Sequence, residues 1–183
     1  MKRTTVYDRN LKAKREVSVS AFHFLFSEIV QYCLAKANSD AQELERQLEE
    51  LGQPLGAKFL ELVCFRDRNS KKDINIIECL RFIHGPLWKT LFNKNADELE
   101  QNTEEHDTFM ISEKEPSLCN QFACLPKGDD YLNCGAFVAG IIEGILASAN
   151  FPAKVSAIFK NDEESRKTVF LVKFNSDTID GNY

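Results

Sequence analysis

The residue best suited to chemistry is Cys134, which follows Asn133 at the start of the apolar stretch 132–150. A cysteine in the first turn of a helix lies near unsatisfied backbone amides and the positive end of the helix dipole. That position lowers the thiol pKa and favours a nucleophilic thiolate. One hypothesis is therefore a thiol acyl-transfer enzyme or hydrolase centred on Cys134.

Catalysis by this thiol would also need a histidine base within hydrogen-bond reach. The chain has three histidines, and all of them precede the cysteine in sequence. His106 lies in an acidic run and His84 beside a Gly-Pro pair, whereas His23 falls on the polar side of an expected helix. These settings are typical of surface or half-buried histidines, so we expect Cys134 to be inert and assign no catalytic residue.

The sequence contains no recognisable motif for binding a metal or a cofactor. Cys119 and Cys124 are separated by four residues, without a second pair or a nearby histidine at zinc spacing. The glycines follow neither the phosphate-loop nor the dinucleotide-binding pattern. We therefore expect no metal and no cofactor.

The stretch 132–150 also has the pattern of a packing helix. Ala136, Gly140 and Gly144 recur every four residues, so they share one side of a helix and let its backbone lie close to a neighbour. The larger apolar residues that widen this side are Phe137, Val138, Ile141, Ile142, Ile145 and Leu146. We predict a core helix that starts at Asn133 and Cys134 and lies on a sheet.

Length and composition restrict the protein class. With 183 residues, 43% of them hydrophobic, the chain predicts one domain, over residues 18–175, between a flexible basic arm (1–17) and a disordered tail (176–183). A formal charge of −5 argues against nucleic-acid binding, which needs clustered Lys and Arg. No run approaches the roughly 18 apolar residues of a membrane span, and the start lacks a signal-peptide core. We expect a soluble, non-secreted protein with six free thiols.

The segment 20–38, with Ser18 or Ser20 as its cap, predicts a helix that is apolar nearly all round. Its polar residues gather in one arc, and large apolar residues fill most of the rest. In a domain of this size, one apolar side would meet the domain's own core and the other would meet another subunit. The candidates for this partner interface are Phe22, Leu25, Phe26, Ile29, Val30 and Cys33.

The remaining helices follow from caps and breakers. A capping-box pattern at residues 39–42 predicts a second helix that Gly52 and Pro54 interrupt, followed by an apolar helical segment over 55–65. Asp73 is the expected cap of the next helix, which Gly85-Pro86 should kink.

The strand-like segments of the sequence predict two hairpins, separated by the core helix. Residues 108–112 and 118–125 form the first hairpin, after an acidic run (94–115) that is typical of a solvated face. Residues 155–159 and 168–174 form the second hairpin. The predicted fold class is α+β, with N-terminal helices packed on a small antiparallel sheet.

Several segments, taken in order, resemble the small α/β subunits of the transport protein particle (TRAPP). The matching stretches are residues 17–22, 25–31, 51–52, 56–57, 85–92, 96–101, 132–143 and 151–155. They extend over about residues 17–174, and several separate segments agree in both order and spacing.

The resemblance implies a non-catalytic core subunit of a vesicle-tethering complex in ER-to-Golgi transport, with the TRAPP small-subunit fold. The assembled complex of that family promotes nucleotide exchange on a Rab GTPase of the Ypt1/Rab1 type. Family members pair through their N-terminal helices, so the implied partners are TRAPP subunit 3 and, beyond it, longin-fold subunits. The implied location is cytoplasmic and peripheral, at the cis-Golgi and ER-derived vesicles.

Two further expectations concern lipids. In subunit 3 of the family a cysteine carries a palmitoyl chain, but no cysteine matches it near residues 66–69 of this chain, so acylation is not expected. An alternative function that stays open beside the thiol enzyme is a lipid-binding module with an internal apolar channel.

Overall fold

The computed structural model describes residues 17–38, 40–66, 75–114, 133–161 and 166–175. The expected arm, apart from Val17, and the expected tail therefore lie outside the described residues. The elements, in order, are α1 (Val19–Lys36), α2 (Ala41–Arg66), α3 (Ile76–Phe82), a π-helical turn (Ile83–Leu87), α4 (Trp88–Phe92), β1 (Glu98–Gln101), β2 (Thr108–Glu113), α6 (Ala136–Ser148), β3 (Ala153–Asn161) and β4 (Arg166–Phe174). The predicted α+β class is confirmed.

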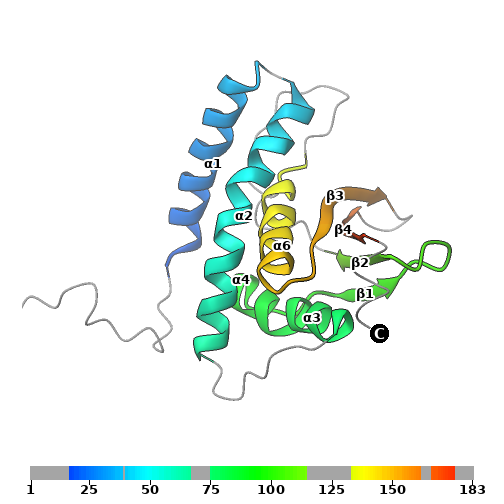
Figure 1. Ribbon diagram of the computed structural model, residues 1–183. Coiled ribbons are helices and arrows are strands. Elements are labelled where there is room, and N and C mark those ends of the chain that lie inside the picture. The colour runs from blue at the N-terminus through cyan, green and yellow to red at the C-terminus, as the bar shows by residue number, and fades with distance from the viewer. Residues whose placement is uncertain (1–16, 39, 67–74, 115–132, 162–165, 176–183) are drawn as a thin grey trace, which may run out of the picture.

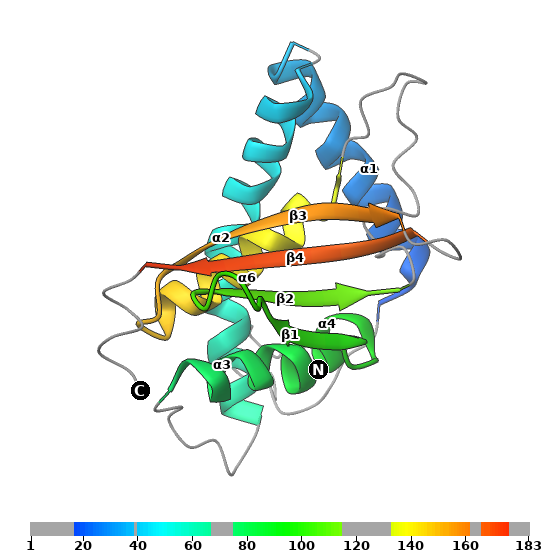
Figure 2. The same ribbon diagram turned by 90° about the vertical axis from the view of Figure 1, so that its right-hand side faces the viewer.

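The strands form one antiparallel sheet in the order β1-β2-β4-β3. Two hairpins, β1–β2 and β3–β4, are joined through the β2–β4 pair, although α6 separates them in sequence. Phe109 and Ile111 of β2 lie opposite Val172 and Phe170 of β4, and all four side chains are buried. Figure 2 shows the face of the sheet that points away from α6, with α6 and α2 behind the sheet.

The chain is arranged in layers (Figure 1). α6 lies between α2 and the sheet, and α1 packs along the outer side of α2. Most of α6 is buried, as expected for a core helix. Asn150, with a φ of 66°, lies in the short connection from α6 to β3. Trp88 of α4 adds to the core by packing edge-on against Phe170, with ring centroids 5.4 Å apart.

The small residues of α6 face α2. A Cβ atom added at Gly140 or Gly144 would come closer than 3.0 Å to the α2 backbone, at Glu49 and Gln53 respectively. α2 presents two glycines of its own, because a Cβ at its Gly52 or Gly56 would similarly strike the α6 backbone. The predicted close approach is therefore present, and the element that meets this side of α6 is α2, while the sheet meets the other side.

α2 is one continuous helix of 26 residues, so the interruption predicted at Gly52 and Pro54 was wrong. Proline removes the N–H that would bond to the carbonyl of Glu50, one turn earlier. Both residues are exposed, so water can reach that carbonyl. Gly52 is buried against α6, and packing on both sides of the proline stabilises a helix that local propensity alone would break.

Of the predicted caps, Ser18 is confirmed, while Ser39, which would open the predicted capping box, lies outside the described residues. The Ser18 side chain accepts a hydrogen bond from the backbone N–H three residues on, and Asp40 accepts one from two residues on. The cap of α3 is Asn75, which accepts from the N–H of Glu78 at 2.8 Å. The predicted cap, Asp73, lies outside the described residues. The Gly85-Pro86 pair lies in a π-helical turn, a local departure from α-helical geometry at the position where a kink was predicted.

β1 was not predicted, because it lies in the acidic run that was expected to form a solvated face. In an edge strand, alternate side chains face solvent, so acidic composition does not exclude a strand. Leu99 of β1 packs against the core, and Glu113 at the end of β2 is only 2% exposed and ion-paired with Lys94 at 3.1 Å. The strand expected over residues 118–125 lies outside the described residues.

Candidate interaction surface on the N-terminal helices

α1 divides its apolar side chains between two sides. Phe26, Val30 and Cys33 are at most 6% exposed and pack in the core. Phe24 and Leu25 lie on the opposite side and are 76% and 61% exposed. At about 100° per residue, Phe24, Leu25 and Tyr32 fall within one arc of roughly 100°, whereas the exposed Val19 in the first turn of α1 lies outside it. With Leu51 of α2, they form what we call the outer α1–α2 face: Phe24, Leu25, Tyr32 and Leu51.

The two-sided helix is therefore present, but the structure revises which residues face outward. Of the six interface candidates, only Leu25 lies on the outer face. Phe22 and Ile29 are half-buried at its border, and Phe26, Val30 and Cys33 belong to the domain core. Because apolar residues cover both sides, the sequence pattern did not reveal which side turns inward. Phe24 and Tyr32 were missed as outward residues, although Leu25 and Tyr32 are seven residues, about two helical turns, apart.

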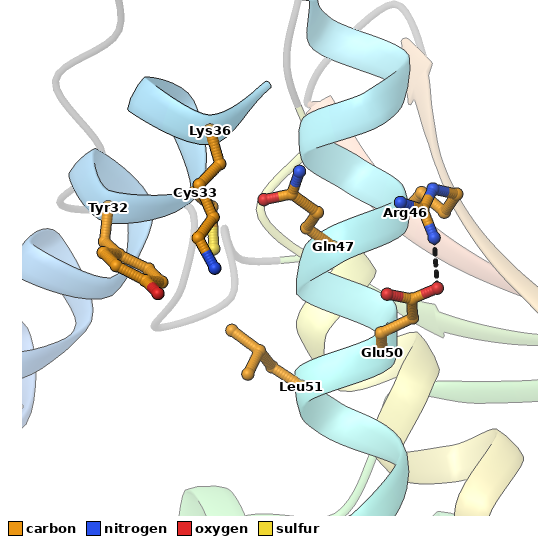
Figure 3. A pocket seen from close by; sticks show the side chains of 7 residues that line it. All are labelled: Tyr32, Cys33, Lys36, Arg46, Gln47, Glu50 and Leu51. Carbon is orange, nitrogen blue, oxygen red and sulfur yellow. Dashed lines mark hydrogen bonds and ion pairs between the residues drawn. The ribbon is translucent and has the colours of Figure 1, made fainter. Parts of the chain in front are cut away.

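A groove of about 310 Å³ lies between the last turns of α1 and the first half of α2. Its lining residues are Tyr32, Cys33, Lys36, Arg46, Gln47, Glu50 and Leu51. Figure 3 shows Tyr32 on the α1 side and Leu51 on the α2 side as its apolar walls. Three of the lining side chains are charged, which does not suit the internal acyl-chain channel considered from the sequence.

Cys134 lies at the start of α6 but has the properties of a packing residue. Its side chain is 0% exposed, and burial together with the nearby Glu45 carboxylate raises the pKa of its thiol to about 12. Glu45 accepts a hydrogen bond from the backbone N–H of Asn133 at 2.8 Å, while the Asn133 side chain accepts from the N–H of Gly135 at 2.9 Å. These bonds organise the start of α6, and the local field opposes thiolate formation.

We expect Cys134 to resist alkylation in the native protein. At neutral pH only a minute fraction of a thiol with such a raised pKa is ionised, and the thiolate is the reacting form. Among the cysteines of the described residues, Cys64 is half-buried and should be modified before the buried ones, whereas Cys134 should react only after unfolding. A time course with iodoacetamide, read by peptide mass spectrometry, measures both rates. Modification of Cys134 within minutes, ahead of Cys64, would instead support the hypothesis that Cys134 is a nucleophile.

The other sequence motifs give no site. Cys119 and Cys124 lie outside the described residues. Among the residues that are described, no group of three or more His, Cys, Asp or Glu side chains could hold a metal ion. In that same part of the chain, no helix combines the length and apolarity needed to cross a membrane.

Comparison with known proteins identifies a family of trafficking proteins. The family model described as transport protein particle (TRAPP) component matches residues 22–175. Trafficking protein particle complex subunit 5 of Dictyostelium discoideum is 48% identical, over 97% of this chain and 96% of that protein. The Homo sapiens subunit 5 is 39% identical, over 92% and 86%. Subunit 31 of Saccharomyces cerevisiae is 28% identical, over 96% and 82%.

A solved structure extends the likeness to the fold. Trafficking protein particle complex subunit 3 from Naegleria fowleri, covalently bound to palmitic acid, superposes with a TM-score of 0.70 at 17% identity. The match covers 86% of this chain and 95% of that chain. The family model spans most of the domain, and curated relatives align with nearly the whole sequence. The chain belongs to the TRAPP component family.

Proposed function

We propose that this protein is a non-catalytic core subunit of the TRAPP vesicle-tethering complex and that its outer α1–α2 face binds a second subunit. The observation that supports this most directly is the exposure of Phe24, Leu25 and Tyr32 on one side of α1, each more than half exposed. Gathered apolar side chains of this size on a surface helix mark a protein-binding site more often than an open surface. Their function in this proposal is assembly.

The proposed partner is a TRAPP component of the subunit 3 type. Two proteins of one fold can pair through equivalent helices about a pseudo-twofold axis. The likeness in fold to the Naegleria fowleri subunit 3 supports such an arrangement. Small longin-fold subunits would join beyond this pair, and contact with membranes would be peripheral and through the assembled complex.

In this proposal the complex acts in ER-to-Golgi transport, at the cis-Golgi and at ER-derived vesicles, and supports nucleotide exchange on a Ypt1/Rab1-type GTPase. The subunit itself contributes rigidity and a docking face. The buried Cys134, with its raised pKa, favours this scaffold role over thiol chemistry.

We expect Leu25→Asp to abolish co-purification with the subunit 3-type component of the source organism. Leu25 is 61% exposed, so the variant should fold, but binding would bury an unpaired carboxylate at an apolar contact. A loss of at least about 30-fold in affinity is expected for such a group. Affinity purification of the co-expressed pair measures the result.

The matched control is Ile158→Asp. Ile158 is 45% exposed, but it lies on β3, in the sheet layer, away from α1 (Figure 1). This variant should retain the partner at the wild-type level. If Leu25→Asp and a companion Phe24→Asp variant both retain the partner while circular dichroism shows them folded, the proposed interface is refuted.

A further inference from the structure

The groove at the end of α1 continues the outer α1–α2 face. Tyr32, which forms its α1 wall, shares the exposed arc of α1 with Leu25, two turns earlier. Leu51, which forms the α2 wall, is 43% exposed. Between these walls lies room for an apolar side chain from outside the domain, because the groove volume of about 310 Å³ exceeds that of any single side chain.

The groove also holds a cation without a carboxylate partner in the described part of the chain. The Nζ atom of Lys36 lies 4.4 Å from the centroid of the Tyr32 ring, within the range of a cation–π contact. The other charged residues of the lining, Arg46 and Glu50, form an ion pair with each other. Figure 3 shows this pair turned away from the Lys36 ammonium, which points into the groove.

We propose that the groove receives one helix of a second TRAPP subunit, which seats an apolar side chain between Tyr32 and Leu51 and sets an Asp or Glu carboxylate against Lys36. This inference rests on the proposed function and assigns the chemistry of its partner. A helix suits the groove because side chains three or four residues apart lie on one face, about one turn from each other. The apolar anchor and the carboxylate can then reach both features at once.

Charge complementarity decides between this occupant and an uncharged one. Lys36 is held over an aromatic ring in a groove with two apolar walls, so a purely apolar partner would remove water from an ammonium that it could not pair. A carboxylate removes that penalty and gains a charge-assisted hydrogen bond. The pair would also fix the register of the incoming helix, since a shift by one residue moves the acid to another face.

The test is the dissociation rate of the purified pair, measured by exchange of a labelled chain at about 0.05 M and about 1 M NaCl. Lys36→Met keeps an apolar stem and removes the charge, so dissociation should be about fivefold faster at low salt. At high salt the Debye length falls to about 3 Å, and the variant should match wild type. Lys36→Glu should dissociate about 30-fold faster at low salt because like charges then meet.

Two further variants complete the design. Leu51→Ala should accelerate dissociation about tenfold at both salt concentrations, since it shortens an apolar wall. Lys160→Met, at an exposed lysine of β3, is the matched charge control and should behave as wild type. Equal dissociation of wild type and Lys36→Met at low salt, or an equal effect of Lys160→Met, overturns the groove inference.

The outcomes separate this inference from the proposed function. Loss of the partner by Leu25→Asp, together with wild-type rates for the Lys36 variants, would leave the interface in place and refute the acidic anchor. A concentration-dependent dimer of the chain alone in sedimentation velocity, dissolved by Lys36→Glu, would assign the groove to a second copy of this chain and overturn the inference.

Discussion

Replacing Gly140 with alanine is expected to destabilise the protein by about 3 kcal/mol, although alanine is the better helix former. By intrinsic propensity alone, Gly→Ala inside a helix would stabilise by up to about 1 kcal/mol. At Gly140 the new Cβ would come closer than 3.0 Å to backbone atoms of Glu49. Backbone atoms cannot move aside by changing rotamer, as a side chain can. α2 and α6 would have to separate, and contacts along their shared length would loosen together. Urea denaturation, followed by circular dichroism, measures the free energy of unfolding.

Gly85→Ala is the control that isolates this packing effect. Gly85 also lies in helical backbone, but a Cβ there meets no atom of any packed neighbour within 4 Å, its chain neighbours such as Pro86 aside. Its substitution should change the free energy of unfolding far less than Gly140→Ala, because only the steric restriction before Pro86 opposes the gain in helix propensity. If Gly140→Ala is as stable as Gly85→Ala, then α2 and α6 tolerate a wider separation than the structure indicates, and the close glycine contact is not needed for stability.

The same glycines explain what the sequence could and could not predict about the core. The spacing of Ala136, Gly140 and Gly144 indicated a helix side made for close approach, because periodicity within one element is a local property. Which element packs against that side depends on both elements of the packed pair. Gly52 and Gly56 form the complementary surface, yet Gly52 together with Pro54 was predicted to interrupt the helix. Only the packed partner shows that these glycines serve contact.

The candidate interface was limited in another way. Amphipathic helices reveal their buried side through contrast with a polar side, and α1 offers little contrast because Phe24 and Phe26 lie on opposite sides. The sequence therefore predicted two apolar sides, but it assigned several core residues of α1 to the partner interface. The groove beside Lys36 was not predicted at all, since it requires α1 and α2 to lie side by side.

Phe26→Ala is expected to release α1 while leaving the rest of the fold intact. The Phe26 ring is 2% exposed and lies between Phe22 of its own helix and Phe137 of α6, with centroid distances of 5.7 Å and 5.4 Å. Truncating a buried phenylalanine typically costs about 3–5 kcal/mol. Because α1 is the outermost layer, this loss exceeds what its other core contacts can offset, and the helix should open locally. Hydrogen exchange should then show lost protection in α1, with α6 and β4 still protected.

Phe24→Ala makes the same chemical change two residues earlier, where the side chain is 76% exposed, and it should keep α1 protected. The comparison also separates two ways of losing the partner. Leu25→Asp should lose it with α1 still protected, because the surface is present but repels the contact. Phe26→Ala should lose it because the partner must first order α1, which weakens apparent affinity by the free energy of that ordering. Full protection of α1 in Phe26→Ala would mean that α1 is held chiefly by contacts other than this ring, and the outer face would not depend on it.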